Sequence, residues 1–189
     1  QTIGIIGGTG SAKSSLVQLI PRLYDVTKGC VKVGGIDVRD YSLESLRDQV
    51  SMVLQKNVLF SGTIYENIRW GDETASDEEV KRVCKLAQAD GFVQEFPNGY
   101  NTKIVQGGNN VSGGQKQRVA AARSLISNPD IILADEPTGA LDTKAARLLM
   151  EKLQEVNQVQ GRTILMVTHS VKAASRAGRV LFIKDGEVF

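Results

Sequence analysis

Few cysteines, few aromatic residues, little net charge and no long apolar run characterise this sequence. The two cysteines, Cys30 and Cys84, lie far apart and in no metal-binding spacing, which excludes a disulfide scaffold and favours reduced thiols inside a cell. The formal net charge is only +2, so no broad surface for nucleic acid or a membrane is expected. The apolar runs are far shorter than the ~20 residues that a membrane span needs.

Glycine, in contrast, is abundant at 19 of 189 residues, and the chain is long enough for one domain, 1–189, with a real core. Short apolar runs predict strands at 2–6, 51–54, 131–134 and 163–168, and a hairpin at 180–189. Helical spacing predicts helices at 13–23, 43–49, 62–69, 76–87, 113–126 and 143–159, with a capping box at residues 76–79. This alternation predicts an α/β fold with a mostly parallel sheet and helices on both faces.

One long stretch, residues 56–123, has no strand pattern, and residues 101–111 within it are predicted to form a loop. We therefore expect a RecA-like core from residues 1–55 and 124–189, interrupted by a helical subdomain at 56–123.

The glycines cluster first at residues 7–15, GGTGSAKSS, between the first predicted strand and helix. This is the setting of a P-loop, in which backbone N–H groups and a helix N-terminus surround a phosphate. Lys13 would reach the β- and γ-phosphates, and the Ser14 hydroxyl would bind Mg²⁺. Ala12 replaces the usual glycine before the lysine, so its methyl group could crowd the phosphates or require an unfavourable backbone angle. A glycine-rich turn without a ligand is the alternative.

An acidic pair, Asp135 and Glu136, ends the predicted strand at 131–134. Ligands of open α/β sheets gather at the carboxyl ends of strands. Asp135 could hold Mg²⁺ through water, and Glu136 could polarise a water that attacks the γ-phosphate. Two solvated loop acids are the alternative.

Further motifs identify a resemblance. VSGGQKQR at 111–118 resembles the signature motif of the nucleotide-binding domain of ATP-binding cassette (ABC) transporters, with Val111 where leucine is commoner. Gln55 resembles the glutamine of the Q-loop, residues 140–142 the D-loop, and His169, the only histidine, the switch histidine. These motifs follow the order of the family over nearly the whole chain.

The resemblance implies a P-loop NTPase that hydrolyses ATP with Mg²⁺ as a head-to-tail dimer. It implies catalytic roles for Glu136 and His169, a D-loop role for Asp142 and Mg²⁺ contacts from Ser14, Gln55 and Asp135. Nucleotide contacts in the same chain fall on Gly8, Thr9, Gly10, Ser11, Ala12, Lys13, Ser14, Ser15 and Gln55. Contacts to the ATP held by the partner fall on Ser112, Gly113, Gly114 and Gln115.

The implied partners are a second nucleotide-binding domain, identical or different, and the transmembrane domains of a transporter, which would dock around residues 55–68. The chain would then lie in the cytoplasm, peripheral to the inner face of a membrane. No nucleic-acid partner is expected.

The two parts of the chain, before and after about residue 128, resemble different members of this family. Residues up to about 127, including FSGTIYENI at 60–68, are similar to exporters that carry membrane and nucleotide-binding domains in one chain. From about residue 128, DEPTGALD at 135–142 is similar to separate ATPase subunits of bacterial systems that handle antimicrobial peptides or lipoproteins. The hypothesis is a hybrid, either an engineered chimera or an unusual branch.

The family also carries an antiparallel β-segment before the P-loop, with an aromatic residue that stacks on adenine. This segment is largely missing here, and Tyr24 and Tyr41 are interpreted as structural. We therefore expect weak affinity for ATP, little preference over GTP, and activity impaired further by Ala12. Two alternatives remain: a truncated or chimeric cassette domain with little turnover, and a cassette ATPase that acts on nucleic acid.

Overall fold

A six-stranded sheet forms the centre of the computed structural model, which describes residues 1–8, 10–184 and 186–189. The strand order is β10-β9-β1-β8-β7-β4, and every neighbouring pair is parallel except β9 and β10. The strands are β1 (Thr2–Gly7), β4 (Val50–Val53), β7 (Ile131–Asp135), β8 (Thr163–Thr168), β9 (Arg179–Lys184) and β10 (Glu187–Val188). The predicted terminal hairpin is confirmed by the antiparallel pairing of β9 with β10; the predicted turn residue Asp185 lies outside the described residues.

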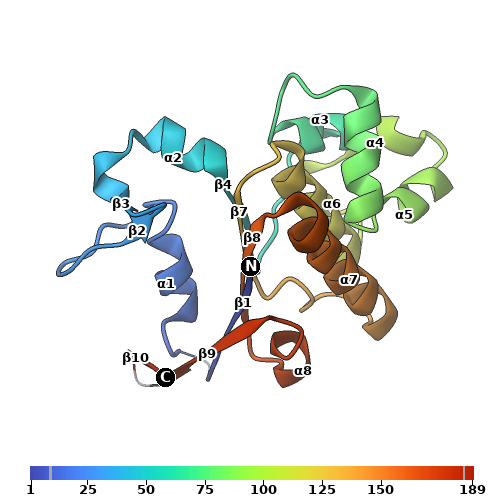
Figure 1. Ribbon diagram of the computed structural model, residues 1–189. Helices are drawn as coiled ribbons and strands as arrows, with labels where there is room; N and C mark the ends of the chain where they lie inside the picture. Colours follow the sequence, from blue (N-terminus) through green and yellow to red (C-terminus); the bar gives the residue numbers. More distant parts are fainter. Residues whose placement is uncertain (9, 185) are drawn as a thin grey trace.

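Helices cover both faces of this sheet, as predicted (Figure 1). On one face lie α1 (Lys13–Gln18) and α2 (Leu43–Gln49); on the other lie α6 (Gly113–Ile126), α7 (Thr143–Gln160) and α8 (Val171–Ala174). A sheet covered on both sides needs apolar residues on both sides of its strands, which explains the uninterrupted apolar run of β7. The α/β fold with a mostly parallel sheet is therefore the observed one.

Three further helices, α3 (Ile64–Arg69), α4 (Asp77–Leu86) and α5 (Asp90–Glu95), gather beside α6 at one end of the molecule (Figure 1). Ser76 and Glu79 form the predicted capping box of α4, and Thr63 and Glu66 form another at the start of α3. The largest buried apolar cluster contains residues from these helices and from the sheet alike. The division into a core and a subdomain at 56–123 stays a prediction.

The prediction that residues 56–123 lack strands is wrong. Strand β5 (Gly62–Thr63) pairs antiparallel with β6 (Lys103–Ile104), so the helix expected from residue 62 begins at 64. The segment 101–111, expected to be a loop, contains β6 and a 3₁₀ turn at Gln106–Gly108. Asn110 stabilises this segment, because its side chain accepts from the Val105 N–H and donates to the Lys103 carbonyl. Two-residue strands carry no periodicity that a sequence could reveal.

The helix expected over 13–23 is also too long, since α1 ends at Gln18. Pro21 has no N–H to continue the hydrogen-bond ladder, and Arg22 has a left-handed φ of 54°. Sequence analysis did not predict the hairpin of β2 (Lys32–Val33) and β3 (Ile36–Asp37), although the Gly-Gly turn between them, with φ of 58° and 84°, is a favoured hairpin turn. It gave no bounds for α5, which lies in a stretch with a helical pattern, and it did not predict α8 or the 3₁₀ turns at Val38–Asp40 and Gly99–Asn101.

No helix in the described part of the chain combines the length and the apolar character that crossing a bilayer requires.

Candidate nucleotide site

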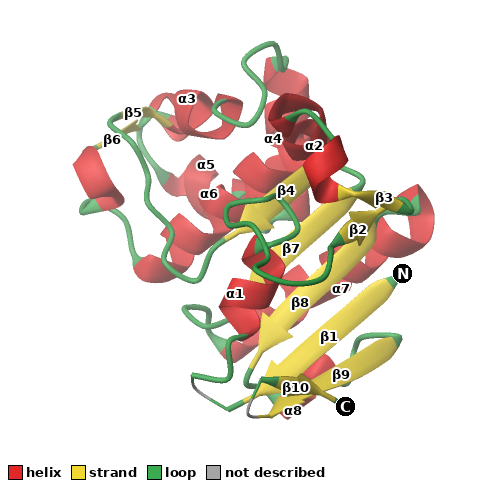
Figure 2. Cartoon of the chain, turned by 90° about the vertical axis from the view of Figure 1, so that its left-hand side faces the viewer, coloured by secondary structure: helices red, strands yellow, loops and turns green. Residues whose placement is uncertain are grey.

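The carboxyl ends of four strands meet at one edge of the sheet (Figure 2). Ile6 of β1 pairs with Thr168 of β8, and Asp135 of β7 pairs with Val167 of the same strand. Strand β4 runs parallel to β7 and ends two residues before Gln55. The segments after these strands are the predicted P-loop, switch histidine, acidic pair and Q-loop. Their common place at one edge follows from the register of the parallel strands.

The P-loop curls around the ammonium group of its own lysine. Lys13 Nζ donates to the carbonyl oxygens of Gly7 at 2.8 Å and Gly8 at 2.7 Å, and to Ser11 Oγ at 3.2 Å. A Cβ added at Gly8 or Gly10 would meet no other atom within 4 Å, so the backbone there faces open space. A cavity of about 570 Å³ adjoins these two glycines. The loop therefore offers exposed backbone and one positive charge, as a phosphate site requires.

Ala12 has the left-handed backbone conformation that a glycine would adopt more easily. Its φ is 64° and its ψ is 17°, at the N-cap of α1. This conformation costs an L-residue roughly 1–2 kcal/mol. Of the two effects expected from Ala12, an unfavourable backbone angle and a methyl group that crowds the phosphates, the structure shows the first.

The side chains of Glu136 and His169 are in direct contact. Glu136 Oε1 accepts from the His169 backbone N–H at 2.7 Å and lies 2.7 Å from His169 Nδ1, while Oε2 accepts from Thr168 Oγ at 3.1 Å. A carboxylate only accepts hydrogen bonds, so Nδ1 carries the proton of this pair. Nε2 is then left to face a ligand, and the side chain of His169 is 73% exposed.

The backbone of Glu136 is strained and well anchored. Its φ of 50° lies in the left-handed region, which is uncommon for a residue with a side chain. Its N–H donates to the Val167 carbonyl at 2.9 Å, and its carbonyl accepts from Gln117 Nε2 at 2.8 Å and from the Gly139 N–H at 3.0 Å. Strain of this kind persists where surrounding contacts hold it, typically at functional sites.

The signature segment forms the exposed N-terminus of α6. Ser112 caps the helix: its Oγ accepts from the Gln115 N–H at 3.3 Å, and its own N–H donates to Gln115 Oε1 at 2.8 Å. Gly114 packs against the D-loop, because a Cβ there would lie 3.1 Å from the Ala140 carbonyl oxygen. Among the described residues, no hydrogen bond joins the signature segment to the P-loop of the same chain. Ser112 and Gly113, at the tip of α6, are exposed to solvent.

Asp142 in the D-loop caps α7 by accepting from the Ala145 N–H at 2.9 Å. This hydrogen bond holds the pKa of the Asp142 carboxyl below its ordinary value, with a smaller contribution from the positive charge of Arg118. The D-loop acid is thus held in its ionised, capping form.

The residues at the sheet edge fit a magnesium ion bound together with a phosphate. Ser14 in α1, Gln55 after β4 and Asp135 at the end of β7 all carry oxygen ligands, which Mg²⁺ prefers. In the described part of the chain, no three His, Cys, Asp or Glu residues cluster as a metal cage. A few protein oxygens completed by water and substrate phosphates are the usual arrangement for Mg²⁺.

Two residues of this site were not predicted. Gln117 is 2% exposed and lies in α6, near the buried Ala120 and Ala121, so a polar residue on an apolar helix face was the available signal. Thr168 is fully buried at the last position of β8, and nothing in the sequence distinguished it. Tyr41 donates to the Val33 carbonyl at 2.9 Å, which agrees with a structural role. The predicted site residue Thr9 lies outside the described residues.

Comparisons with known proteins identify the family of the chain. Residues 1–139 match the family model described as ABC transporter. The chain is 38% identical over 188 residues to an ATP-dependent lipid A-core flippase of Desulfotalea psychrophila, covering 100% of this chain and 32% of the flippase. It is 42% identical over 188 residues to the multidrug resistance protein pgp-1 of Caenorhabditis elegans, covering 100% of this chain and 14% of that protein.

Among solved structures, a bacterial Atm1-family ABC exporter with ATP bound superposes with a TM-score of 0.95 at 34% identity, covering 100% of this chain and 33% of the exporter chain. The chain thus spans about a third, or less, of the length of these relatives. A family match over most of the chain, together with relatives aligned along its whole length, leads to one conclusion: the chain belongs to the ABC transporter family and is a nucleotide-binding domain of the exporter type.

Proposed function

We propose that the chain binds and hydrolyses ATP with Mg²⁺ and drives an exporter through the pairing of two such domains. The contact between Glu136 and His169, at the sheet edge that also carries the P-loop, is the observation that supports this most directly. It brings together a proton acceptor and a group for the γ-phosphate, 33 residues apart in the chain.

In binding, the P-loop supplies backbone N–H groups and Lys13 the positive charge. The ammonium group of Lys13 would exchange its bonds to the Gly7 and Gly8 carbonyls for phosphate oxygens. The Atm1-family exporter that this chain resembles has ATP bound. Ser14, Gln55 and Asp135 would hold the magnesium ion, which neutralises charge on the β- and γ-phosphates.

In hydrolysis, a water oxygen bonds to the γ-phosphorus and the bond to the oxygen bridging to the β-phosphate breaks. Glu136 accepts the proton of that water, and its burial and three hydrogen bonds fix the direction from which it does so. We propose that His169 contacts the γ-phosphate as a doubly protonated ring, in which Nδ1–H donates to Glu136 and orients the ring, and Nε2–H donates to a γ-phosphate oxygen.

The second half of the site would come from another domain. In the helix tip from Ser112 to Gln115, the N–H groups of Gly113 and Gly114 have no hydrogen bond among the described residues, and they lie at a helix N-terminus, which favours an anion. Because this tip has no hydrogen bond to the described part of its own P-loop, we propose that it closes over ATP held by the partner domain, in a head-to-tail pair. ATP then stabilises the pair, and hydrolysis releases it.

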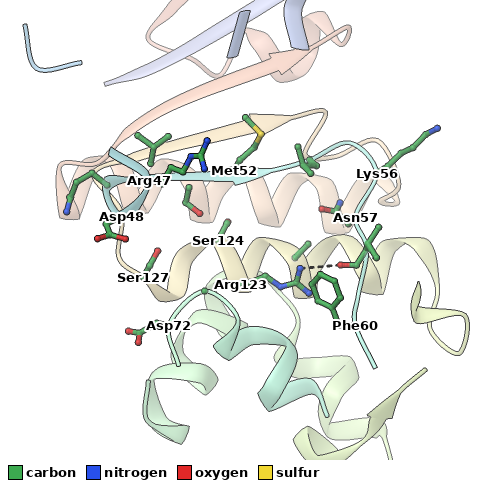
Figure 3. Close-up of a pocket in the computed structure, with 17 residues that line it drawn as sticks. Arg47, Asp48, Met52, Lys56, Asn57, Phe60, Asp72, Arg123, Ser124 and Ser127 are labelled. Carbon is green, nitrogen blue, oxygen red and sulfur yellow. Dashed lines mark hydrogen bonds between the residues drawn. The ribbon is translucent and has the colours of Figure 1, made fainter. Parts of the chain in front are cut away.

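A pocket of about 680 Å³ between β4 and α6 suits the transmembrane partner (Figure 3). Arg123 projects from α6 toward residues 56–60, donating to the Val58 and Asn67 carbonyls and lying 5.2 Å over the Phe60 ring. Leu54 and Lys56, the two neighbours of Gln55 in the chain, line this pocket. A helix docked there would therefore contact the segment that carries Gln55, one of the proposed magnesium ligands. This would hold the domain at the cytoplasmic face of a membrane.

Trp70, the only tryptophan, provides a reporter for that docking. It stacks on Phe60 with ring centroids 4.5 Å apart and is 64% exposed. Docking of the transmembrane partner should shift its emission to shorter wavelength, and Lys56→Glu, which reverses a charge in the pocket lining, should weaken that shift. An emission maximum that stays constant on assembly would place the partner elsewhere.

We also propose, as a separate hypothesis, that the segment from about residue 128 has a different origin from the segment before it. The support is DEPTGALD at 135–142, which resembles separate ATPase subunits. The flippase and pgp-1 align with both segments. The hypothesis predicts that residues 128–189 match separate subunits better than exporters; equal matches to exporters in both segments would reject it.

A phosphate-release assay tests the proposed function. The chain should release phosphate from ATP only with Mg²⁺, and the rate should rise faster than linearly with protein concentration, because two copies form each site. Lys13→Ala should abolish the release. Magnesium-independent release, or none at any protein concentration, would overturn the proposal.

A further inference from the structure

The side chain of Gln117 bridges two backbone groups of the turn at residues 136–140, which follows β7 and carries Glu136. Its Nε2 donates to the Glu136 carbonyl oxygen at 2.8 Å, and its Oε1 accepts from the Ala140 N–H at 3.0 Å. The residue is 2% exposed, so both ends of its amide depend on these protein partners. The amide therefore spans the whole turn from the predicted general base to the D-loop.

Both ends of this turn need such support. Glu136 has its strained φ of 50°, and the turn itself closes through the Gly139 N–H to the Glu136 carbonyl at 3.0 Å. Without Gln117, the Ala140 N–H would lose its partner and Glu136 would lose one of the bonds that hold its backbone. A residue held in the left-handed region relaxes when its surroundings no longer fix it.

Gln117 also lies close to the signature tip. It follows Ser112 by five positions in the same helix, about 7.5 Å along the helix axis. A helix segment of this length moves as a rigid body. Gly114, which lies between Ser112 and Gln117 in the sequence, packs against the Ala140 carbonyl. A displacement of the tip is therefore passed to the Gln117 amide, and from there to Glu136.

We propose that Gln117 is a positioning residue, which holds Glu136 in its productive conformation and links it to the seating of the signature tip of the same chain. This rests on the proposed function, in which Glu136 acts on the ATP of its own chain while Ser112 contacts the ATP of the partner. Gln117 then joins the two nucleotide sites of the pair through one buried amide.

Two variants test the bonds. Gln117→Met keeps the length of the side chain and removes both hydrogen bonds, while Gln117→Glu, whose buried carboxyl can stay protonated, can keep both of them. Gln154→Met is the matched control, because Gln154 also donates from a helix to a backbone carbonyl, that of Arg176, at 2.9 Å and away from the site.

Phosphate release and Mg-ATP binding are measured for each variant. Gln117→Met should lower kcat about tenfold or more and leave KM and the calorimetric Kd within about twofold, because it disturbs the transition state rather than binding. Gln117→Glu should retain more of kcat than Gln117→Met does, because its protonated carboxyl can restore both bonds. Gln154→Met should lose thermal stability with kcat unchanged. A kcat of Gln117→Met within twofold of that of the control would overturn the proposal, since both bonds would then be dispensable.

Glu136→Gln distinguishes this failure from failure of the proposed function. If Glu136→Gln abolishes turnover while Gln117→Met retains it, only the positioning role is rejected. If Glu136→Gln also turns over at the parental rate, the assignment of Glu136 as base is rejected instead.

Discussion

Glu136 Oε1 lies 2.7 Å from both the backbone nitrogen and the ring Nδ1 of His169. One carboxylate oxygen thus fixes the backbone and the ring of the residue proposed to face the γ-phosphate. The pair joins β7 to β8 beyond the last residues of both strands, at the edge where the P-loop begins.

Glu136→Gln should lower the rate of phosphate release by about 10²- to 10⁴-fold, the range for loss of a general base. Its amide oxygen can still accept from the His169 N–H, so binding of Mg-ATP should persist and the ATP-bound pair should accumulate. Glu155→Gln is the control, because Glu155 is an exposed acid whose ion pair among the described residues is with Lys152. Parental turnover in Glu136→Gln would remove Glu136 from the chemistry.

Ala12→Gly should raise both nucleotide affinity and stability. Glycine adopts the φ of 64° without strain, so the free energy of unfolding should rise by about 1 kcal/mol. Ala146→Gly, inside α7, should instead lower it by about 1 kcal/mol, because glycine weakens a helix interior. Calorimetry with Mg-ATP and a urea titration measure the two effects. An unchanged Kd would mean that the methyl group is harmless to the phosphates.

The two thiols should react at very different rates. Cys84 is fully buried in α4, and burial raises the pKa of its thiol to about 12, whereas Cys30 is exposed. At pH 8 a thiol reagent should therefore label one cysteine per chain quickly, and the second only after denaturant is added. Cys30→Ser should abolish the fast phase. Two equally fast phases would contradict the packing of α4 against its neighbours.

The capping box of α4 should make stability depend on pH. The Ser76 N–H bond holds the pKa of the Glu79 carboxyl below its ordinary value. A lowered folded pKa means that this stabilisation is present above the unfolded value of about 4.3 and is lost as pH falls through the lower, folded value. Glu79→Gln keeps a capping side chain and should flatten that part of the profile of thermal midpoint against pH. Glu78→Gln, next to it and without a capping bond among the described residues, should leave the Glu79 contribution in place; equal flattening by both variants would contradict the assignment.

How far the sequence could predict this structure depended on the length of the pattern. The parallel strands and the α4 cap were predicted because apolar runs and the spacing of Ser76 and Glu79 are local signals. The pairing of β5 with β6 was not, because two-residue strands have no period and their partners lie about 40 residues apart.

In the candidate site, too, only the features with a local sequence pattern could be predicted. The sequence placed Glu136 and His169 after strands, and the fold required both to lie at one edge. Their contact could not be predicted, because it depends on the left-handed turn at Glu136 and on its anchor, Gln117, in a helix 19 residues earlier. Strained backbone is held by tertiary contacts, which leave no local pattern.

Sedimentation of the Glu136→Gln chain with and without Mg-ATP tests the central claim most directly, namely that two copies enclose the nucleotide between the P-loop of one and the signature tip of the other. The account predicts a dimer with Mg-ATP, and a monomer without the nucleotide or with Ser112→Arg added. A chain that binds Mg-ATP by calorimetry and yet sediments as a monomer at every protein concentration would contradict it.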